Sequence, residues 1–365
     1  MPLGPWSRAA GAALLPVVAA YALTYGTFWL FAGQGSGGLL QQACKWDCHW
    51  YASILFEGYA REPNVAAQPG AANYAFWPVF PLLVDAVRRI PGLFFDEAAF
   101  LVNLAANTAF ALVFMANHRL FTADPGKARL VLTAFLLSPG TLYLVVPYTE
   151  AVFNALLLLT VVLWRRGRPL GAVPGGVALT ATRATGVLLP MAWAVATLIR
   201  HRFSPAACVA HAWPSVLALA AMPLGAVAFT LFLYAHTGDP LAFAAAQAGW
   251  NRGLDDPATI LWTGLTGDAT HRIGAVAGLC ALPVLAIGLW RRPGDRDLFA
   301  YVGASLVPAL VTSAVSLMRY AFAVFIPYLL LDALPHRWLM GVIAAFVGIR
   351  VWVAKLWIGG AESLI

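Results

Sequence analysis

Apolar runs of about 20 residues recur along the whole chain, separated by short connectors that carry most of the charged residues. A helix of that length spans the roughly 30 Å hydrocarbon core of a bilayer. The pattern therefore predicts an all-α protein with about eleven membrane helices. We expect them over residues 9–32, 98–120, 128–146, 149–164, 171–182, 186–199, 212–235, 273–290, 298–315, 320–334 and 338–358.

Three of these segments differ from a simple span. Segments 171–182 and 186–199 are short, so they are either two half-deep helices that meet at 182–185 or one long kinked helix. The first run, 9–32, is too long for the apolar core of a signal peptide and lacks a small-residue cleavage site. We interpret it as a retained helix.

Residues 79–95 have a different pattern, because polar and apolar positions separate onto two faces. Asp85, Arg88 and Arg89 recur at helical spacing on one face, and apolar residues occupy the other. That amphipathic pattern is typical of a helix that lies in the membrane interface. A short twelfth span is the alternative.

The composition agrees with a polytopic membrane protein. Of the 365 residues, 61% are hydrophobic and 11% are charged, with a mean hydropathy of +0.75. Soluble domains carry roughly 25% charged residues. No stretch has the composition of a separate soluble domain, so we expect residues 1–365 to form one transmembrane domain.

The net charge of +7 is distributed as short basic clusters between the apolar runs. This distribution follows the positive-inside rule and argues against a nucleic-acid partner, which would need a continuous basic face. With the N-terminus inside, the basic connectors are cytoplasmic and most acidic residues lie outside. Two large regions, 33–97 and 236–272, are then extracytoplasmic. Binding and catalytic groups usually lie on such loops.

Residues 46–51 read Trp-Asp-Cys-His-Trp-Tyr and place Asp47 in an aromatic cluster just after the first apolar run. A carboxylate there suits chemistry on a lipid-borne substrate. In glycosyl transfer it would take the proton of an acceptor hydroxyl while the anomeric carbon develops positive charge. Trp46, Trp50 and Tyr51 are candidates for the walls of a sugar or lipid site. An ordinary interfacial aromatic belt is the alternative.

Glu57 and His49 are further candidates from the same region. On a helix that begins near Trp46, Trp50 follows Asp47 at helical spacing, whereas Glu57 lies almost three turns on and falls on another face. His49 either binds a phosphate or lies at the surface.

Arg319 and Tyr320 lie between two apolar segments at the outer boundary. A lone arginine near hydrocarbon is costly and usually has a partner or a role. Its planar, permanently charged fork suits a lipid phosphate, and a snorkelling residue at a helix end is the alternative. We expect Arg319 to bind the phosphate of a lipid substrate, with Tyr320 beside it.

The remaining binding candidates are Arg183, Glu150, Gln247 and Trp250. Arg183 lies between the two short segments, and Glu150 opens a helix, where its carboxylate meets the positive end of the helix dipole. Substrate binding and an Arg183–Glu150 ion pair explain this pair equally well. Gln247 and Trp250 either contact a sugar or pack at the interface. Asp239, which precedes a proline, is predicted to cap a helix.

Four cysteines are too few for a disulfide framework. Cys44 and Cys48 flank Asp47 on the expected oxidising side, so a local disulfide is an open alternative to two free thiols. The sequence has no Walker A loop, GxGxxG, HExxH or CxxC motif, and no DxD-type pair lies beside Asp47. We therefore expect neither a metal nor a cofactor.

Six ordered blocks link these candidates to a known family. The blocks are Trp46-Asp47 with Tyr51 and Glu57-Gly58-Tyr59; residues 75–82; Ser138-Pro139 with Tyr148-Thr149-Glu150; residues 182–186; Gly238-Asp239-Pro240 with Gln247 and Trp250; and Arg319-Tyr320 with Pro327. In these blocks the chain resembles the PIG-V-like mannosyltransferases, members of the GT-C class of membrane glycosyltransferases.

The resemblance implies a GT-C fold with its active site on the extracytoplasmic side. It implies a polyprenyl-phosphate sugar donor, with mannose as the sugar, an inverting transfer in one displacement, and Asp47 as the base. The acceptor is a lipid-linked molecule or a glycan. The Ala-, Arg- and Gly-rich composition favours a bacterial plasma membrane; in a eukaryote the corresponding side is the lumen of the endoplasmic reticulum.

A polytopic transporter or lipid flippase is the competing function. It would share the membrane helices, the intramembrane arginines and the half-helices. It would not need an acid–aromatic cluster confined to one face, and it would usually show two pseudo-symmetric halves. The sequence contains no second copy of the cluster, which favours the glycosyltransferase.

Overall fold

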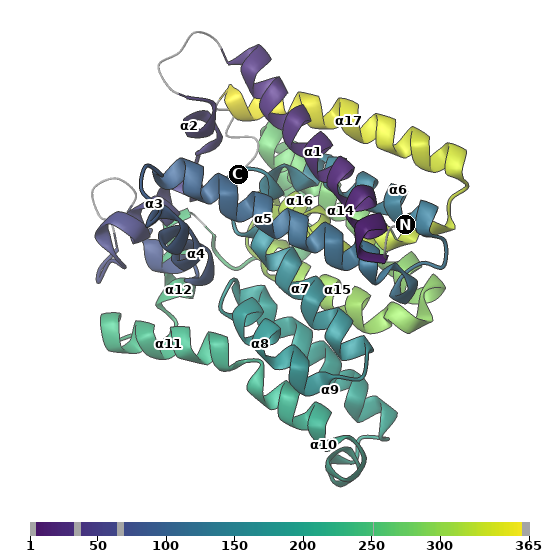
Figure 1. Cartoon of the computed structure of the whole chain (residues 1–365). Coiled ribbons are helices and arrows are strands. Elements are labelled where there is room, and N and C mark those ends of the chain that lie inside the picture. Colours follow the sequence, from purple (N-terminus) through teal and green to yellow (C-terminus); the bar gives the residue numbers. More distant parts are fainter. Residues whose placement is uncertain (1–4, 33–37, 64–68, 251, 360–365) are drawn as a thin grey trace.

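The computed structural model describes residues 5–32, 38–63, 69–250 and 252–359 (Figure 1). Within these ranges the chain forms helices and no strand, as predicted for an all-α protein. The α-helices are α1 (Pro5–Phe31), α2 (Leu39–Ala43), α3 (Asp47–Glu57), α4 (Val79–Arg88), α5 (Phe95–Ala116), α6 (Pro125–Leu137), α7 (Glu150–Arg165), α8 (Pro169–Thr180), α9 (Leu188–Arg200), α10 (Pro205–Ala221), α11 (Leu224–Thr237), α12 (Ala242–Ala245), α13 (Pro257–Thr266), α14 (Ala269–Arg291), α15 (Arg296–Leu310), α16 (Leu317–Phe322) and α17 (His336–Ile358). The 3-10 helices are η1 (Asn73–Ala75), η2 (His118–Leu120), η3 (Pro139–Leu144), η4 (Ala184–Val187), η5 (Ala246–Trp250), η6 (Pro293–Asp295), η7 (Ala314–Ser316) and η8 (Ile326–Ala333).

Five helices in the described part of the chain are long and apolar enough to cross a membrane. They are Ala13–Phe31, Phe95–Ala116, Pro205–Thr237, His271–Arg291 and His336–Ile358. Helices η7 and α16 together, followed by η8, would add a sixth span, although a 58° bend separates them. The predicted number of about eleven spans is thus not confirmed, because several predicted helices are present but shorter than a span.

Helix α1 packs on α5, α6 and α17, and α7 packs between α5 and α8. Helix α14 contacts α13, α15 and α16. Figure 1 shows α2, α3, α4 and α12 gathered at one end of this bundle. The two regions expected outside the membrane therefore meet at a single end.

A small apolar cluster joins these two regions. Tyr74 and Trp77 from the first region pack with Phe229 of α11 and with Ala246 of η5. Gly249 of the second region lies directly against the backbone of Gly70 and Ala71 in the first region. A Cβ at Gly249 would lie 2.1 Å from the amide nitrogen of Ala71. A side chain at Gly249 would therefore push the two regions apart.

The amphipathic segment forms α4, which ends at Arg88 and is 10 residues long. A helix of that length measures about 15 Å, so α4 is too short for the twelfth span. Its apolar side packs on α5. On its polar side Asp85 pairs with Arg88 at 3.1 Å and with Arg89 at 2.8 Å.

Two predicted helices, 128–146 and 320–334, are wrong as single helices. The first ends at Leu137, because Pro139 follows and the residue before it is extended, with φ −65° and ψ 153°. The second is interrupted between α16 and η8. Both breaks expose backbone groups that an apolar environment cannot satisfy.

A buried asparagine of α7 satisfies the break between α16 and η8. Asn154 Nδ2 donates to the carbonyl of Ala323 at 2.7 Å, and its Oδ1 accepts from the amide of Phe325 at 3.1 Å. Its amide group thus replaces hydrogen bonds that a continuous helix would make internally. This explains how the chain bends here without leaving both backbone groups unpaired.

A buried arginine of α17 supports the break after α6. Arg350 is 0% exposed, and its Nη1 donates to the carbonyls of Leu136 and Ser138 at 3.1 and 2.9 Å and to Thr141 Oγ1 at 2.9 Å. Its Nε and Nη2 donate to Thr24 Oγ1 of α1 at 3.1 and 2.9 Å. Neutral dipoles from three elements therefore solvate this charge.

Replacing Arg350 by alanine should destabilise the protein by roughly 3 kcal/mol, because the change removes these hydrogen bonds and leaves a cavity. Thermal unfolding of the purified protein in detergent measures the effect. Arg337→Ala, at an exposed position of the same helix, is the matched control and should unfold like the unaltered protein. Equal unfolding temperatures for the two variants would contradict a structural role for Arg350.

Candidate functional site

A cavity of about 330 Å³ opens where the two outer regions meet the broken helices. Its lining comes from α3, from the turns at 75–77 and 182–185, and from segments 243–252 and 308–320. The lining residues are Asp47, Tyr51, Ala75, Phe76, Trp77, Thr149, Thr182, Arg183, Ala184, Thr185, Phe243, Ala244, Gln247, Trp250, Arg252, Pro308, Ala309, Thr312, Ser316, Arg319 and Tyr320. The cavity thus combines charged, hydroxyl and aromatic side chains.

Asp47 is the first residue of α3, so the helix begins one residue after Trp46, near the start expected from the sequence. The amide of Asp47 donates to the hydroxyl of Tyr148 at 3.3 Å, and that hydroxyl donates to the carbonyl of Lys45 at 3.1 Å. Trp46, just before the helix, adopts a φ of 49° and packs edge-on against Trp357 at 4.6 Å. These contacts hold the backbone at the start of α3, from which the Asp47 carboxylate projects.

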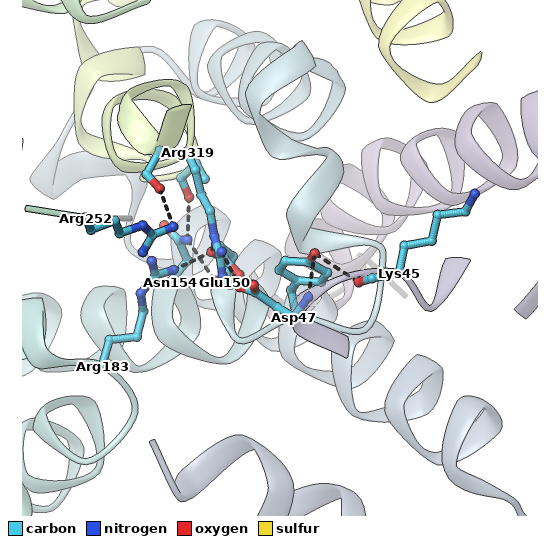
Figure 2. Close-up of polar contacts among 10 residues, drawn as sticks. Lys45, Asp47, Glu150, Asn154, Arg183, Arg252 and Arg319 are labelled. Carbon is cyan, nitrogen blue, oxygen red and sulfur yellow. Dashed lines mark hydrogen bonds and ion pairs between the residues drawn. The ribbon is translucent and has the colours of Figure 1, made fainter. Parts of the chain in front are cut away.

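An ion-pair network connects Asp47 to the interior (Figure 2). Arg319 Nη1 donates to Asp47 Oδ2, and Arg319 Nε donates to Glu150 Oε1. Arg183 Nη1 donates to the same Glu150 oxygen. The Glu150 side chain is 2% exposed. Of the two alternatives for Arg183 and Glu150, the ion pair is therefore present, and Arg319 extends it to Asp47.

Aromatic rings surround the two arginines of this network. The guanidinium of Arg319 lies 4.7 Å from the ring of Tyr148, and that of Arg183 lies 5.2 Å from the ring of Tyr320 and 5.8 Å from that of Phe153. Such cation–π contacts stabilise a guanidinium that water cannot fully solvate. Arg319 already contacts two carboxylates of the protein itself, and the structure does not test the phosphate-binding role that the sequence predicts for it.

Trp50, Tyr51, Phe76 and Trp250 form an aromatic wall. Trp50 stacks on Phe76 at 5.9 Å and meets Trp250 edge-on at 5.5 Å, while Tyr51 meets Phe76 edge-on at 5.2 Å. Burial raises the pKa of Tyr51 well above its usual range, and the nearby carboxylate of Asp47 raises it further. Its phenol is thus a neutral donor or acceptor at neutral pH.

The structure brings together most of the residues that the sequence singled out. Seven of them line the cavity: Asp47, Tyr51, Arg183, Gln247, Trp250, Arg319 and Tyr320. Trp50 and Glu150 are not lining residues but contact two of them, Trp250 and Arg319. Trp46 packs on Trp357, and neither residue lines the cavity. His49 and Glu57 are exposed and are not among the lining residues. Their predicted contact with substrate therefore receives no support from this geometry.

The prediction that Asp239 is the N-cap of a helix is wrong. Helix α12 begins at Ala242, with Leu241 as its N-cap. The Asp239 carboxylate accepts from the amide of Leu241 at 2.8 Å and so stabilises the turn before the helix. A residue of the second region that sequence reasoning missed is Arg252, which lines the cavity.

Cys44 and Cys48 form a disulfide across the turn that contains Asp47. Asp96 lies near both sulfurs, since one donor atom from each of the three residues falls within 4.8 Å of the others. Cysteine binds metals as a thiolate, so these two cannot do so while the disulfide is intact.

No family model matches the sequence. The chain is similar to GPI alpha-1,6-mannosyltransferase 2 of Mus musculus, at 30% identity over 140 residues, which is 36% of this chain and 27% of the mouse protein. The proteins of that name from Rattus norvegicus and Cricetulus griseus match at 30% over 139 residues and 29% over 140 residues. The similarity thus spans about a quarter of the length of these relatives.

The structure is similar to the crystal structure of ArnT from Cupriavidus metallidurans bound to undecaprenyl phosphate. The TM-score is 0.55, and the alignment covers 96% of this chain and 76% of ArnT at 13% sequence identity. At that identity the likeness shows the fold alone. The described part of the chain is therefore all-helical with a fold similar to that of ArnT, and it contains several helices long and apolar enough to cross a membrane, as the sequence predicts for a multi-pass membrane protein.

Changing Cys44 and Cys48 together to serine should lower stability by about 2 kcal/mol, the value expected for closing so short a loop. Thermal unfolding of the purified protein measures the effect. Cys280→Ser, at an exposed free cysteine, is the control.

Alkylation without and with reductant tests the disulfide directly. Mass spectrometry of the unfolded protein should show two alkylated cysteines before reduction and four after it. Four alkylated cysteines before reduction would mean that the two thiols are free.

Proposed function

We propose that this protein is an inverting membrane mannosyltransferase that uses a polyprenyl-phosphate sugar as donor and a lipid-linked molecule or glycan as acceptor. The observation that carries the proposal is the position of Asp47, whose carboxylate lines a cavity of about 330 Å³ beside arginines and aromatic rings. The mannosyltransferases that match part of the sequence, and the undecaprenyl phosphate bound to ArnT, support the sugar and the lipid class.

In this proposal Asp47 is the general base. The acceptor oxygen forms a bond to the anomeric carbon as the bond from that carbon to the phosphate oxygen breaks. The electron pair leaves with the phosphate, and the acceptor proton passes to the Asp47 carboxylate. A single displacement from the opposite face inverts the configuration. Arg319 orients the carboxylate through Oδ2, which keeps the base in position for the proton.

The aromatic wall suits the other parts of the substrates. Phe76 and Trp250 line the cavity and present apolar ring surfaces, which bind the face of a sugar or an isoprenoid chain. Thr149 lies at the same site with its buried hydroxyl unpartnered among the described residues. A buried hydroxyl without a partner costs free energy, so a sugar hydroxyl or water is a suitable partner for Thr149.

Asp47→Asn should reduce turnover by roughly 10²-fold or more, because the amide cannot accept the proton. The side chain keeps its size and an oxygen for Arg319, so thermal unfolding should change little. Mass spectrometry of products formed from polyprenyl-phosphate mannose and a membrane lipid extract measures turnover. Asp239→Asn, at an exposed position of the other region, is the control. Full turnover by Asp47→Asn would remove Asp47 from the mechanism.

The cavity should open on the extracytoplasmic side, because the basic connectors then lie inside. An impermeant thiol reagent on intact cells should label Glu62→Cys, at an exposed position of the first region, in a Cys280→Ser background. Arg168→Cys, in a basic connector, should be labelled only after permeabilisation. The reverse result would place the chemistry in the cytoplasm.

A further inference from the structure

We infer that Arg252, rather than Arg319, binds the phosphate of the donor and of the leaving group. This inference rests on the proposed function, since it names a residue of the same site. The sequence pattern did not single out Arg252, which lies in the second outer region and reaches the cavity from the segment after η5. Figure 2 shows Arg252 and Arg183 reaching in from one side and Asp47 from the other.

The first argument is the charge around the cavity. Three arginines line it, Arg183, Arg252 and Arg319, and the carboxylates of Asp47 and Glu150 form ion pairs with two of them, Arg183 and Arg319. Arg319 contacts both carboxylates, and Arg183 contacts Glu150. One positive charge therefore exceeds the negative charges. A phosphodiester, the linkage of a polyprenyl-phosphate sugar, carries one negative charge and would neutralise it.

The second argument is the set of partners of Arg252. Its Nη1 donates to Gln247 Oε1 at 2.7 Å and its Nη2 to Ser316 Oγ at 3.2 Å. Both acceptors are uncharged, and both belong to residues that line the cavity. An arginine has five N–H donors, so Arg252 can keep these two bonds and still donate to phosphate oxygens. Gln247 and Ser316 thus orient the guanidinium without neutralising it.

The third argument is position. Ser316 ends η7 and directly precedes α16, whose third residue is Arg319. The bond from Arg252 to Ser316 therefore places the guanidinium within one helical turn of the residue that orients Asp47. A phosphate at Arg252 would lie close to the carboxylate but separate from its ion pair, as a displacement between acceptor and leaving group requires.

The chemistry gives Arg252 more to do than hold the donor. When the bond between the anomeric carbon and the phosphate oxygen breaks, its electron pair stays on that oxygen, and the phosphodiester becomes a monoester with a second negative charge. A guanidinium at the phosphate interacts more strongly as this charge develops. Arg252 should therefore lower the barrier as well as the KM of the donor.

The experiment measures binding and turnover for the full-length protein in nanodiscs of phosphatidylcholine. Undecaprenyl phosphate is the probe, and native mass spectrometry reports its binding. Arg252→Ala should weaken binding roughly ten- to a hundredfold, the range for a lost hydrogen bond to a charged group. It should also lower kcat in the transfer assay. Arg252→Lys keeps the positive charge but loses the planar guanidinium, so its affinity for the probe and its kcat should lie between those of the unaltered protein and Arg252→Ala.

Arg272→Ala is the matched control, because Arg272 is an exposed arginine in the same outer region and is absent from the cavity lining. It should bind the probe like the unaltered protein. Should Arg252→Ala fail to fold, Arg252→Gln retains a donor for Ser316 and gives the same comparison. Inorganic phosphate as a competitor separates recognition of the phosphate alone from recognition of the lipid.

Three results overturn the inference. Unchanged binding and turnover in Arg252→Ala, with the unaltered protein active, would refute the role of Arg252 and leave the proposed function intact. Loss of binding in Arg319→Ala but not in Arg252→Ala would place the phosphate at Arg319. An unaltered protein that neither binds the probe nor transfers mannose would refute the proposed function itself.

Discussion

The arrangement of the site depends on the ion pairs that the carboxylate of Glu150 forms with two arginines. One of its oxygens accepts from both Arg183 and Arg319, and the side chain is 2% exposed. Arg319 then reaches Asp47. This chain of ion pairs joins α7, the turn before η4, α16 and α3. Removing the Glu150 carboxylate would leave the largely buried guanidinium of Arg183 without its ion-pair partner, which is far costlier than losing an exposed ion pair.

That network needs interrupted helices, because a continuous span would cover the backbone and side chains that form the cavity. An interruption in an apolar environment must in turn be satisfied by other groups. Asn154 forms hydrogen bonds with the free backbone groups between α16 and η8, and Arg350 forms hydrogen bonds with the free carbonyls after α6. The cavity therefore depends on two polar side chains that do not line it. Asn154 belongs to α7 and Arg350 to α17, and the sequence predicted both helices as ordinary membrane spans.

The sequence predicts the parts of this structure that follow from local pattern. The amphipathic α4 follows from the spacing of its polar residues, and α3 begins one residue after the helix start expected near Trp46. For Arg183 and Glu150 the sequence left an ion pair and substrate binding as equal alternatives, and the structure contains the ion pair. The break in 128–146 has a local signal, Pro139, which a prediction based on hydropathy passed over. The break in 320–334 does not follow from local pattern, because Asn154, which satisfies it, is 169 positions from Ala323 in the chain. Apolar composition is the same on either side of such a break, so hydropathy alone cannot find it.

Arg252 was missed for a related reason. Its partners are a glutamine and a serine, which give no charge pattern to detect, and Ser316 is 64 positions away. The fold nevertheless divides two tasks between two arginines. If a phosphate had to compete for Arg319, donor binding would break the contact that directs Asp47. With the phosphate at Arg252, the carboxylate stays in position while the donor binds, so base and leaving group can act in the same displacement.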